Sequence, residues 1–276
     1  MRVGVIASGA RHPVLDAMAG LLAPAHHVGR IDPGHVTDPN GPLADVYLLK
    51  ARTRPALTLA RTLEGRGAPV VNSAAATGLC QDRTAMAALA HSAGLPFPET
   101  TTFPTLGGLS DATTDLTRPL VVKSRHSRRH DLVARVDSAV RLRALAADWA
   151  QEPVVVQPFA DNSGQDHKLW VVGDRVFAAL RPSELASTGR GPTLSLPLGE
   201  LPVGWIDLVR EVGAVFALDV YGVDIVDTGA GTPLIVDINA FPGIRDQEGA
   251  PEALAALVLR TATGARARAT GAPLLS

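Results

Sequence analysis

The sequence Tyr221-Gly-Val-Asp-Ile-Val-Asp-Thr-Gly-Ala-Gly-Thr-Pro-Leu-Ile-Val-Asp-Ile-Asn-Ala-Phe-Pro-Gly243 decides which fold this chain is expected to adopt. Two runs rich in β-branched residues, 223–226 and 234–238, flank the segment Thr-Gly-Ala-Gly-Thr. Short β-rich runs joined by a few small residues that include glycine are typical of a β-hairpin. The stretch therefore predicts an antiparallel hairpin near the C-terminal end of the chain.

Two carboxylates face each other in this expected hairpin. With the turn centred immediately after Ala230, Asp224 lies directly opposite Asp237. Side chains alternate between the two faces of a strand, so Asn239 joins the two carboxylates on one face. The residues expected on the opposite face are Ile225, Val236 and Ile238.

Facing carboxylates destabilise a sheet unless something compensates their charge. A hard cation between them removes the repulsion, and oxygen ligands of this kind suit Mg²⁺. Two solvated carboxylates on an exposed face are the alternative interpretation.

Composition is typical of a globular protein with no nucleic-acid or membrane partner. The 276 residues are 46% hydrophobic and 19% charged, and the formal net charge is -1. Cys80 is the only cysteine, which excludes an internal disulfide and a multi-cysteine metal site. No apolar run is long enough to span a membrane. We expect a soluble, cytoplasmic protein of two domains, or of one large domain with an insertion.

Strand and helix patterns alternate over residues 1–78, which predicts a mostly parallel sheet. Ligands of such sheets bind beyond the carboxyl ends of the strands. Here those ends lie near Ser8-Gly9-Ala-Arg11 and near Lys50-Ala-Arg52. A glycine in a β–α turn also has a purely conformational explanation, so Ser8 and Gly9 are weak candidates for substrate binding.

Later segments alternate between strands and helices around two lysines. Asp82 is expected to cap a helix, Lys123 ends an apolar strand, and Lys168 lies in a strand of a hairpin around Gly173-Asp174. The segment 182–202 is rich in proline and glycine and is interpreted as a mobile loop on the substrate side. Helices are expected over 205–218 and 250–263, followed by a frayed end over 264–276.

This combination resembles the ATP-grasp superfamily over essentially the whole chain. The resemblance implies an α/β fold: a parallel βαβ domain, followed by two α+β subdomains that enclose ATP. The expected limits are 1–78 for the N-terminal domain, 79–102 for a linker helix, 103–158 for the small subdomain and 159–276 for the C-terminal subdomain. The segments that carry the resemblance are Val71-Asn-Ser73, Cys80-Gln-Asp-Arg83, Ala93-Gly-Leu-Pro-Phe-Pro98 and Asp237-Ile-Asn-Ala-Phe-Pro-Gly243.

The resemblance also implies a Mg²⁺–ATP site, with Mn²⁺ as the alternative ion. Lys123 and Lys168 would hold phosphates, and Arg181 would face the transferring phosphoryl group. The metal ligands would be Asp224, Asp237 and Asn239, and the remaining nucleotide contacts Arg83, Gln157, Pro158, Phe159, Ala160 and Ser183. As alternatives, Lys168 lies on a solvated face, Phe159 packs in the core, and Arg181-Pro-Ser183 is simply a strand end.

One departure from the family concerns the loop after Lys123. ATP-grasp ligases carry glycines there, whose backbone N–H groups close over phosphates. This chain has Ser124-Arg-His-Ser-Arg-Arg-His130 instead, a basic loop without glycine. We expect this loop to bind an anionic substrate. The candidate substrate contacts are Arg125, Arg128, Arg129, His130, Ser8, Gly9 and Gly243.

Three functions compete. The preferred function is a RimK-type carboxylate–amine ligase, which phosphorylates a carboxylate to an acyl phosphate that an amine then attacks. The alternative is an inositol-trisphosphate kinase of the same superfamily, in which His130 and Lys168 contact substrate phosphates. A nucleotide-binding protein without turnover is the third. A homodimer is a further expectation from the family.

Overall fold

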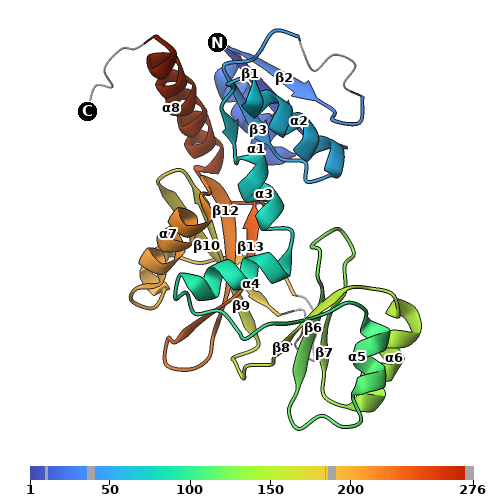
Figure 1. Ribbon diagram of the computed structural model, residues 1–276. Coiled ribbons are helices and arrows are strands. Elements are labelled where there is room, and N and C mark those ends of the chain that lie inside the picture. Colours follow the sequence, from blue (N-terminus) through green and yellow to red (C-terminus); the bar gives the residue numbers. More distant parts are fainter. Residues whose placement is uncertain (10–11, 36–40, 184, 186–190, 271–276) are drawn as a thin grey trace.

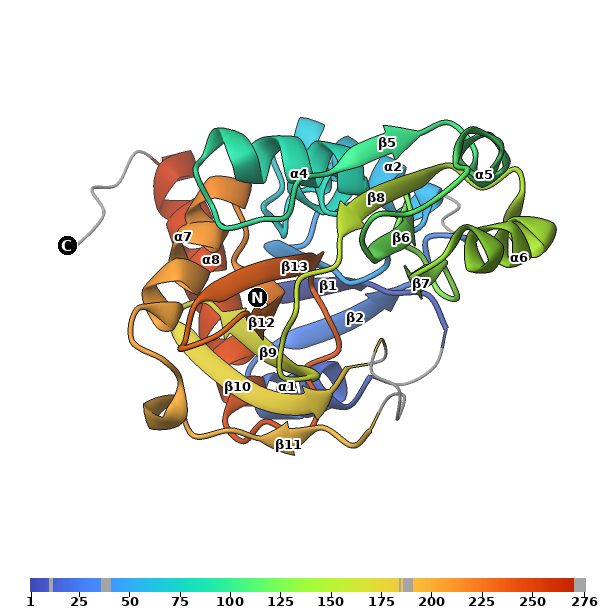
Figure 2. The same ribbon diagram turned by 90° about the horizontal axis from the view of Figure 1, so that it is seen from below.

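The described part of the chain forms three sheets (Figure 1). The computed structural model describes residues 1–9, 12–35, 41–183, 185 and 191–270. Figure 2 shows the middle sheet with α5 and α6 standing apart, while the N-terminal and C-terminal sheets lie close to α8. The domain limits expected from the sequence stay predictions.

The N-terminal sheet is parallel, in the order β2-β1-β3-β4, as the alternating pattern predicts. Because β1 lies between β2 and β3, the chain reverses its direction of winding between β1 and β3, where ligand crevices form. The strands are β1 Arg2–Ile6, β2 His27–Ile31, β3 Val46–Leu49 and β4 Val70–Val71; the helices are α1 Pro13–Leu22, α2 Arg54–Gly65 and α3 Ala74–Leu79.

The middle sheet is antiparallel, in the order β5-β8-β6-β7. Its strands are β5 Thr101–Phe103, β6 Leu120–Ser124, β7 Val133–Val136 and β8 Val154–Pro158, and its helices are α5 Leu106–Ala112 and α6 Ala139–Trp149. The sequence did not predict α5, because Gly107 and Gly108 are poor helix formers. Thr105 caps the helix, and Gly107 lies so close to the Ala150 carbonyl that a Cβ would be only 3.1 Å away.

The C-terminal sheet is antiparallel, in the order β11-β10-β9-β12-β13. Its strands are β9 Gln165–Val172, β10 Arg175–Pro182, β11 Leu194–Ser195, β12 Val220–Asp227 and β13 Pro233–Ala240. The hairpin expected around Gly173-Asp174 is confirmed as β9–β10. One face packs under α7 Trp205–Phe216 and α4 Arg83–Ser92, and Asp82 caps the start of α4 as predicted.

Two expectations about irregular segments need correction. The segment 182–202 contains β11, which pairs with β10, and a short 3₁₀ helix η1 at Leu198–Glu200. Residues 184 and 186–190 of that segment lie outside the described residues. The last helix, α8, spans Ala250–Thr270, so 264–270 is helical where a frayed end was expected. Residues 271–276 lie outside the described range.

The predicted pairing of Asp224 with Asp237 is confirmed, although the turn is not where we placed it. Asp227 pairs with Pro233, which centres the turn on Ala230, and a register shift between Asp224 and Ile225 restores the acid pair. The extra residue is Val236, whose neighbour Ile235 pairs with Ile225. Bulges of this kind re-aim side chains. Val236 therefore lines the cavity beside Asp237 rather than the opposite face, where it was predicted.

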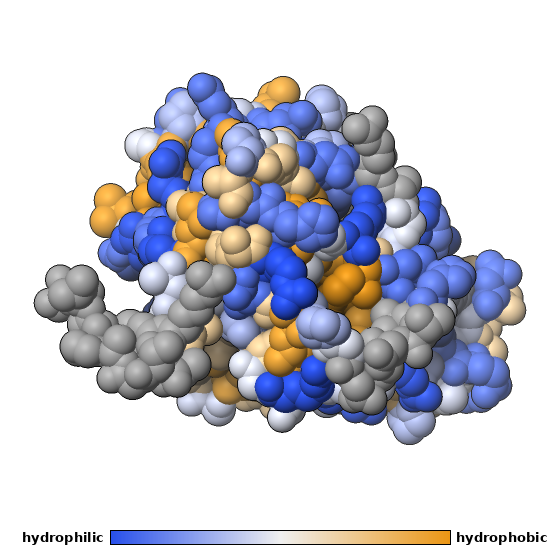
Figure 3. All heavy atoms as spheres, turned by 90° about the horizontal axis from the view of Figure 1, so that it is seen from above, coloured by the Kyte–Doolittle hydropathy of each residue, from blue (hydrophilic) through white to orange (hydrophobic). Residues whose placement is uncertain are grey.

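On the face that carries α8 and the N-terminal sheet, hydrophobic residues form small areas separated by hydrophilic ones (Figure 3). No helix in the described part of the chain has the length and apolar character needed to cross a membrane.

A buried asparagine joins the N-terminal sheet to the C-terminal one. Asn72 follows β4 and is only 1% exposed. Its Nδ2 donates to the Val220 carbonyl at 2.6 Å, and its Oδ1 accepts from the N–H groups of Asp219 and Val220 at 2.8 and 3.0 Å. The start of β12, and with it the position of Asp224, is thereby tied to the end of β4.

Asn72→Ala should lower the free energy of unfolding by about 2–4 kcal/mol, because it leaves buried backbone groups without partners. Chemical denaturation followed by circular dichroism measures the change. Gln151→Ala, an exposed position after α6, is the control and should change stability by less than about 0.5 kcal/mol. Equal stability of the two variants would refute this role of Asn72.

Candidate active site

A row of charged side chains crosses the C-terminal sheet. Lys168 on β9 is registered with Asp224 on β12, which is registered with Asp237 on β13. The three side chains share one face because directly paired residues of neighbouring strands point the same way. Asp166 lies two residues before Lys168 on β9 and is registered with Arg181 on β10. The Arg181 Nη2 donates to Asp166 Oδ2 at 3.1 Å.

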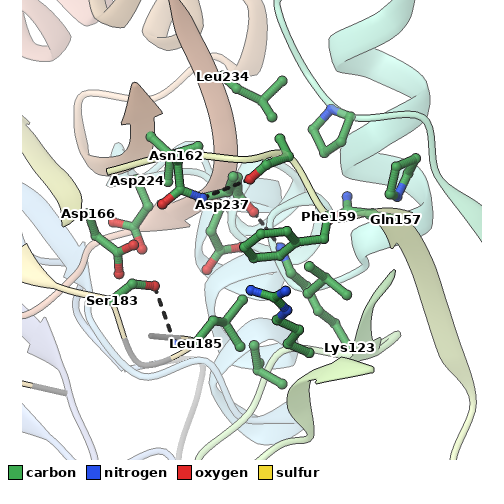
Figure 4. Close-up of a pocket in the computed structure, with 18 of the residues that line it drawn as sticks. Lys123, Gln157, Phe159, Asn162, Asp166, Ser183, Leu185, Asp224, Leu234 and Asp237 are labelled. Carbon is green, nitrogen blue, oxygen red and sulfur yellow. Dashed lines mark hydrogen bonds between the residues drawn. The ribbon is translucent and has the colours of Figure 1, made fainter. Parts of the chain in front are cut away.

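This row forms one wall of a cavity of about 530 Å³ between the middle and C-terminal sheets. Figure 4 shows Lys123 and Phe159 from the middle sheet facing Asp224 and Asp237 across it. Of the predicted nucleotide and metal residues, those that line the cavity are Arg83, Lys123, Gln157, Pro158, Phe159, Ala160, Lys168, Ser183, Asp224 and Asp237. Folding thus brings together ten of the positions selected from the sequence.

Lys123 lies at the centre of this arrangement. It is buried, and its Nζ donates to the carbonyl of Val236, the bulge residue, at 2.7 Å. Burial lowers the pKa of Lys123 to about 8, and the neighbouring Asp237 carboxylate opposes that shift. The bulge therefore anchors a cation from the middle sheet beside a carboxylate of the C-terminal sheet.

The two facing carboxylates have different partners. Lys168 Nζ donates to Asp224 Oδ2, while Asp237 accepts from Asn239 Nδ2 at 2.9 Å and lies 3.9 Å from Arg83 Nε. Burial raises the pKa of Asp224, and Lys168 only partly offsets this. Burial alone would also raise the pKa of Asp237, but Arg83 and Lys123 outweigh it and the pKa is lowered. Asp237 is thus the more firmly ionised of the two.

The carboxylates and the Asn239 amide fit a hard divalent cation in donor chemistry, since all offer oxygen. No cluster of three or more His, Cys, Asp or Glu side chains suited to a metal occurs among the residues that the structure describes. Any metal would therefore rest on these two carboxylates and the amide, with the rest of its ligands from bound phosphates or water.

The other end of the cavity is less polar. Phe159 is half-buried and absent from the hydrophobic core, so the alternative that it packs in the core is wrong. The guanidinium of Arg135 lies 4.1 Å from the centroid of its ring. Gln157 is buried and donates to Thr100 Oγ1 at 2.9 Å. An aromatic ring beside the lining segment 157–160 suits a planar base.

Arg83 links the linker helix to the loop that follows β6. Its Nη1 donates to the Ser124 carbonyl and to Asp131 Oδ2, both at 2.7 Å. Its Nε is buried and has no hydrogen-bond partner in the described part of the chain. Arg83 therefore places a buried positive charge at the wall of the cavity, beside Asp237.

A second cavity, of about 720 Å³, shares Lys168 and Asp224 with the first. It lies where the end of β3 meets the C-terminal sheet and the segment 241–247. The predicted residues Arg181, Asn239 and Gly243 line it. Sequence reasoning placed a crevice near Lys50 and Arg52 but did not select them as site residues; both line this cavity, as does Arg245.

The four residues of the basic loop that we predicted to bind substrate line neither cavity: Arg125, Arg128, Arg129 and His130. Arg125 pairs with Asp82 at 2.7 Å, and Arg128 pairs with Glu152 through two hydrogen bonds of 2.6 and 2.8 Å. Arg129 and His130 are exposed, and the Arg129 Nε donates to the His130 ring at 3.1 Å. Arg125 and Arg128, which we expected to bind substrate, are thus paired with carboxylates of the protein itself.

The N-terminal candidates are also displaced from the cavities. Ser8 and Gly9 are exposed and line neither cavity. Gly9 has φ +80°, and its carbonyl accepts from Arg30 Nη2 at 2.8 Å, so the conformational explanation of this glycine holds. Arg11 lies outside the described residues.

Similar proteins include curated sequences and solved structures. A probable alpha-L-glutamate ligase of Xanthomonas oryzae pv. oryzae (strain MAFF 311018) is 29% identical over 211 residues, which are 71% of this chain and 69% of that protein. The RimK domain ATP-grasp protein of Sphaerobacter thermophilus DSM 20745 has a TM-score of 0.76 and 24% identity, covering 94% of this chain and 100% of that chain. No protein-family model matches the chain.

A third similar protein was solved with a nucleotide. The D-alanine–D-alanine ligase of Bacillus anthracis complexed with ATP has a TM-score of 0.70 and 17% identity, covering 98% of this chain and 99% of that chain. At this level of identity, the two structural comparisons establish a shared fold.

The pairing of Lys168 with Asp224 should contribute to the free energy of unfolding. Lys168→Met should lower the free energy of unfolding by about 1–3 kcal/mol, because Asp224 then faces Asp237 without its own cation. The double variant Lys168→Met/Asp224→Asn removes the uncompensated charge and should recover most of the loss. Urea denaturation of both variants measures this. A single variant as stable as the unmodified protein would show that the lysine does not compensate Asp224.

Proposed function

Because the chain has the ATP-grasp fold and its two cavities share Lys168 and Asp224, we propose that the protein is an ATP-dependent carboxylate–amine ligase. The shared wall is the observation that carries the proposal. A phosphoryl donor in the first cavity and an acceptor in the second would meet at these two side chains. The known relatives reported above are all named as ligases or ATP-grasp proteins, none as a kinase.

The first cavity would hold ATP. Phe159 and the backbone of 157–160 would bind the adenine, and Lys123, Lys168 and Arg83 would neutralise the phosphates. Phosphoryl transfer depends mostly on positioning and on stabilising charge, so fixed buried cations are the main contribution a protein can make. Arg181 lies on the acceptor side and would face the transferred phosphoryl group.

Mg²⁺ would be held by Asp224, Asp237 and Asn239, whose oxygens form the donor set described above. Such an ion would supply positive charge that offsets the phosphates. Lys168 is hydrogen-bonded to Asp224 in the structure. We infer that Lys168 turns to the phosphates when the ligand arrives.

The reaction would proceed in two steps. An oxygen of the acceptor carboxylate attacks the γ-phosphorus, the bond to the β-phosphate oxygen breaks, and ADP leaves an acyl phosphate. The amine nitrogen then attacks the acyl carbon, phosphate leaves, and the amine proton passes to solvent. The charged row would orient the acceptor for the first step.

Hydroxylamine distinguishes the ligase from a kinase. With a carboxylate acceptor and Mg²⁺–ATP, hydroxylamine should replace the amine and yield a hydroxamate together with ADP, because it attacks acyl phosphates. Asp237→Asn should abolish both products while the circular dichroism spectrum stays unchanged. Formation of a stable phosphate ester of a polyol, with no hydroxamate, would establish the kinase instead. Nucleotide binding without ADP release would establish the non-catalytic protein.

Lys123→Met tests the nucleotide site directly. Removing a buried cation next to the phosphates should weaken ATP binding by about tenfold or more. Isothermal titration calorimetry with ATP measures the affinity. Arg141→Gln, an exposed cation on α6, serves as the matched control and should bind ATP as the unmodified protein does. Unchanged affinity in Lys123→Met would place the phosphates elsewhere.

A further inference from the structure

The second cavity holds more positive charge than the proposed reaction needs. Two of its cations are matched by carboxylates, since Lys168 pairs with Asp224 and Arg181 with Asp166. Three other cations line the cavity, Lys50, Arg52 and Arg245, against one further carboxylate, that of Asp246. Over the described ranges, none of these three forms an ion pair with a carboxylate.

Two of the three cations are hydrogen-bonded to uncharged oxygens. Lys50 Nζ donates to the Phe241 carbonyl at 2.7 Å, and Arg52 Nη1 donates to Asn239 Oδ1 at 3.4 Å. Arg245 is exposed and lies in the segment that follows β13. The end of β3 and the segment 241–247 therefore present their cations to the same cavity, beside Asn239.

The three cations also disfavour one another's charge. Burial first, and then the neighbouring Arg52 and Arg245, together lower the pKa of Lys50 to about 8. Burial, Lys50 and Arg245 likewise lower the pKa of His12 to about 4. Like charges gathered in a half-buried cavity are unfavourable without an anion to offset them. Such an arrangement is typical of a site built for an anionic ligand.

We propose that Lys50, Arg52 and Arg245 bind a second anionic group of the acceptor, so that the acceptor carries two negative groups. This inference rests on the proposed function for the role of the first group, which Lys168 and Arg181 would orient for reaction. The second group is a carboxylate or a phosphate. The three cations determine specificity for it and take no part in the chemistry.

Binding of small anions tests the proposal without any turnover. Glutarate and 3-phosphoglycerate each carry a carboxylate and a second anionic group, whereas butyrate carries one carboxylate. Calorimetry at low salt should show both dianions, or one of them, binding at least tenfold more tightly than butyrate. The preferred dianion identifies the second group as carboxylate or phosphate. Equal binding of all three, or no binding of either dianion, would overturn the proposal.

Substitutions then locate the site. Arg52→Gln and Arg245→Gln should each weaken dianion binding about tenfold and leave butyrate binding unchanged. Arg61→Gln, which removes an exposed cation on α2, is the matched control and should bind the dianions normally. If Arg61→Gln weakens binding as much as the two cavity variants, the preference reflects overall charge and the proposed subsite is wrong.

The same variants separate this inference from the proposed function. If Arg52→Gln loses dianion binding and the unmodified protein forms no hydroxamate from any acceptor, the subsite is supported and the ligase is refuted. Hydroxamate formed equally well from butyrate and glutarate would support the ligase and refute the subsite. In the expected result, Arg245→Gln raises the KM for a dianionic acceptor about tenfold and leaves kcat unchanged.

Discussion

Two carboxylates on neighbouring strands cannot stay side by side unless positive charge surrounds them, and the site of this protein is arranged around that constraint. Asp224 and Asp237 are registered across β12 and β13, and their compensating cations come from three other segments. Lys168 comes from β9, Lys123 from β6 and Arg83 from α4. Because the middle sheet supplies Lys123 across the cavity, the charge requirement also fixes how that sheet approaches the C-terminal sheet.

The same constraint explains how the cavity would accept a ligand. The protein's own lysines neutralise the acids, and a divalent cation with phosphates would offer a second way to balance the same charges. An exchange between the two requires little rearrangement of the backbone, because the bulge at Val236 already directs its carbonyl at Lys123. The second cavity shows the reverse case. Lys50, Arg52 and Arg245 place positive charge there, and a bound anion would balance it.

Local patterns in the sequence predicted the described strands other than β5 and β11, together with the β9–β10 hairpin and the acid pair, because alternation and turn residues act over a few positions. The predicted position of the β12–β13 turn was wrong by half a residue, yet Asp224 still pairs with Asp237 because a bulge shifts the register. Sequence periodicity does not reveal such a bulge. The basic loop misled for another reason. Its arginines looked free, but Asp82 is 43 positions from Arg125, and only the fold brings them together. The strand-end rule pointed to the neighbourhood of Lys50 and Arg52, but Lys50 meets Phe241 across 191 positions, so only the fold shows which residues complete that cavity.

Crystals of the protein soaked with Mn²⁺ and a non-hydrolysable ATP analogue test the central claim most directly. The account predicts an anomalous scattering peak about 2.1 Å from oxygens of Asp224, Asp237 and Asn239, with Lys168 turned from Asp224 to the phosphates. A peak elsewhere, or a nucleotide bound while Lys168 still contacts Asp224 and no metal lies between the carboxylates, would contradict it.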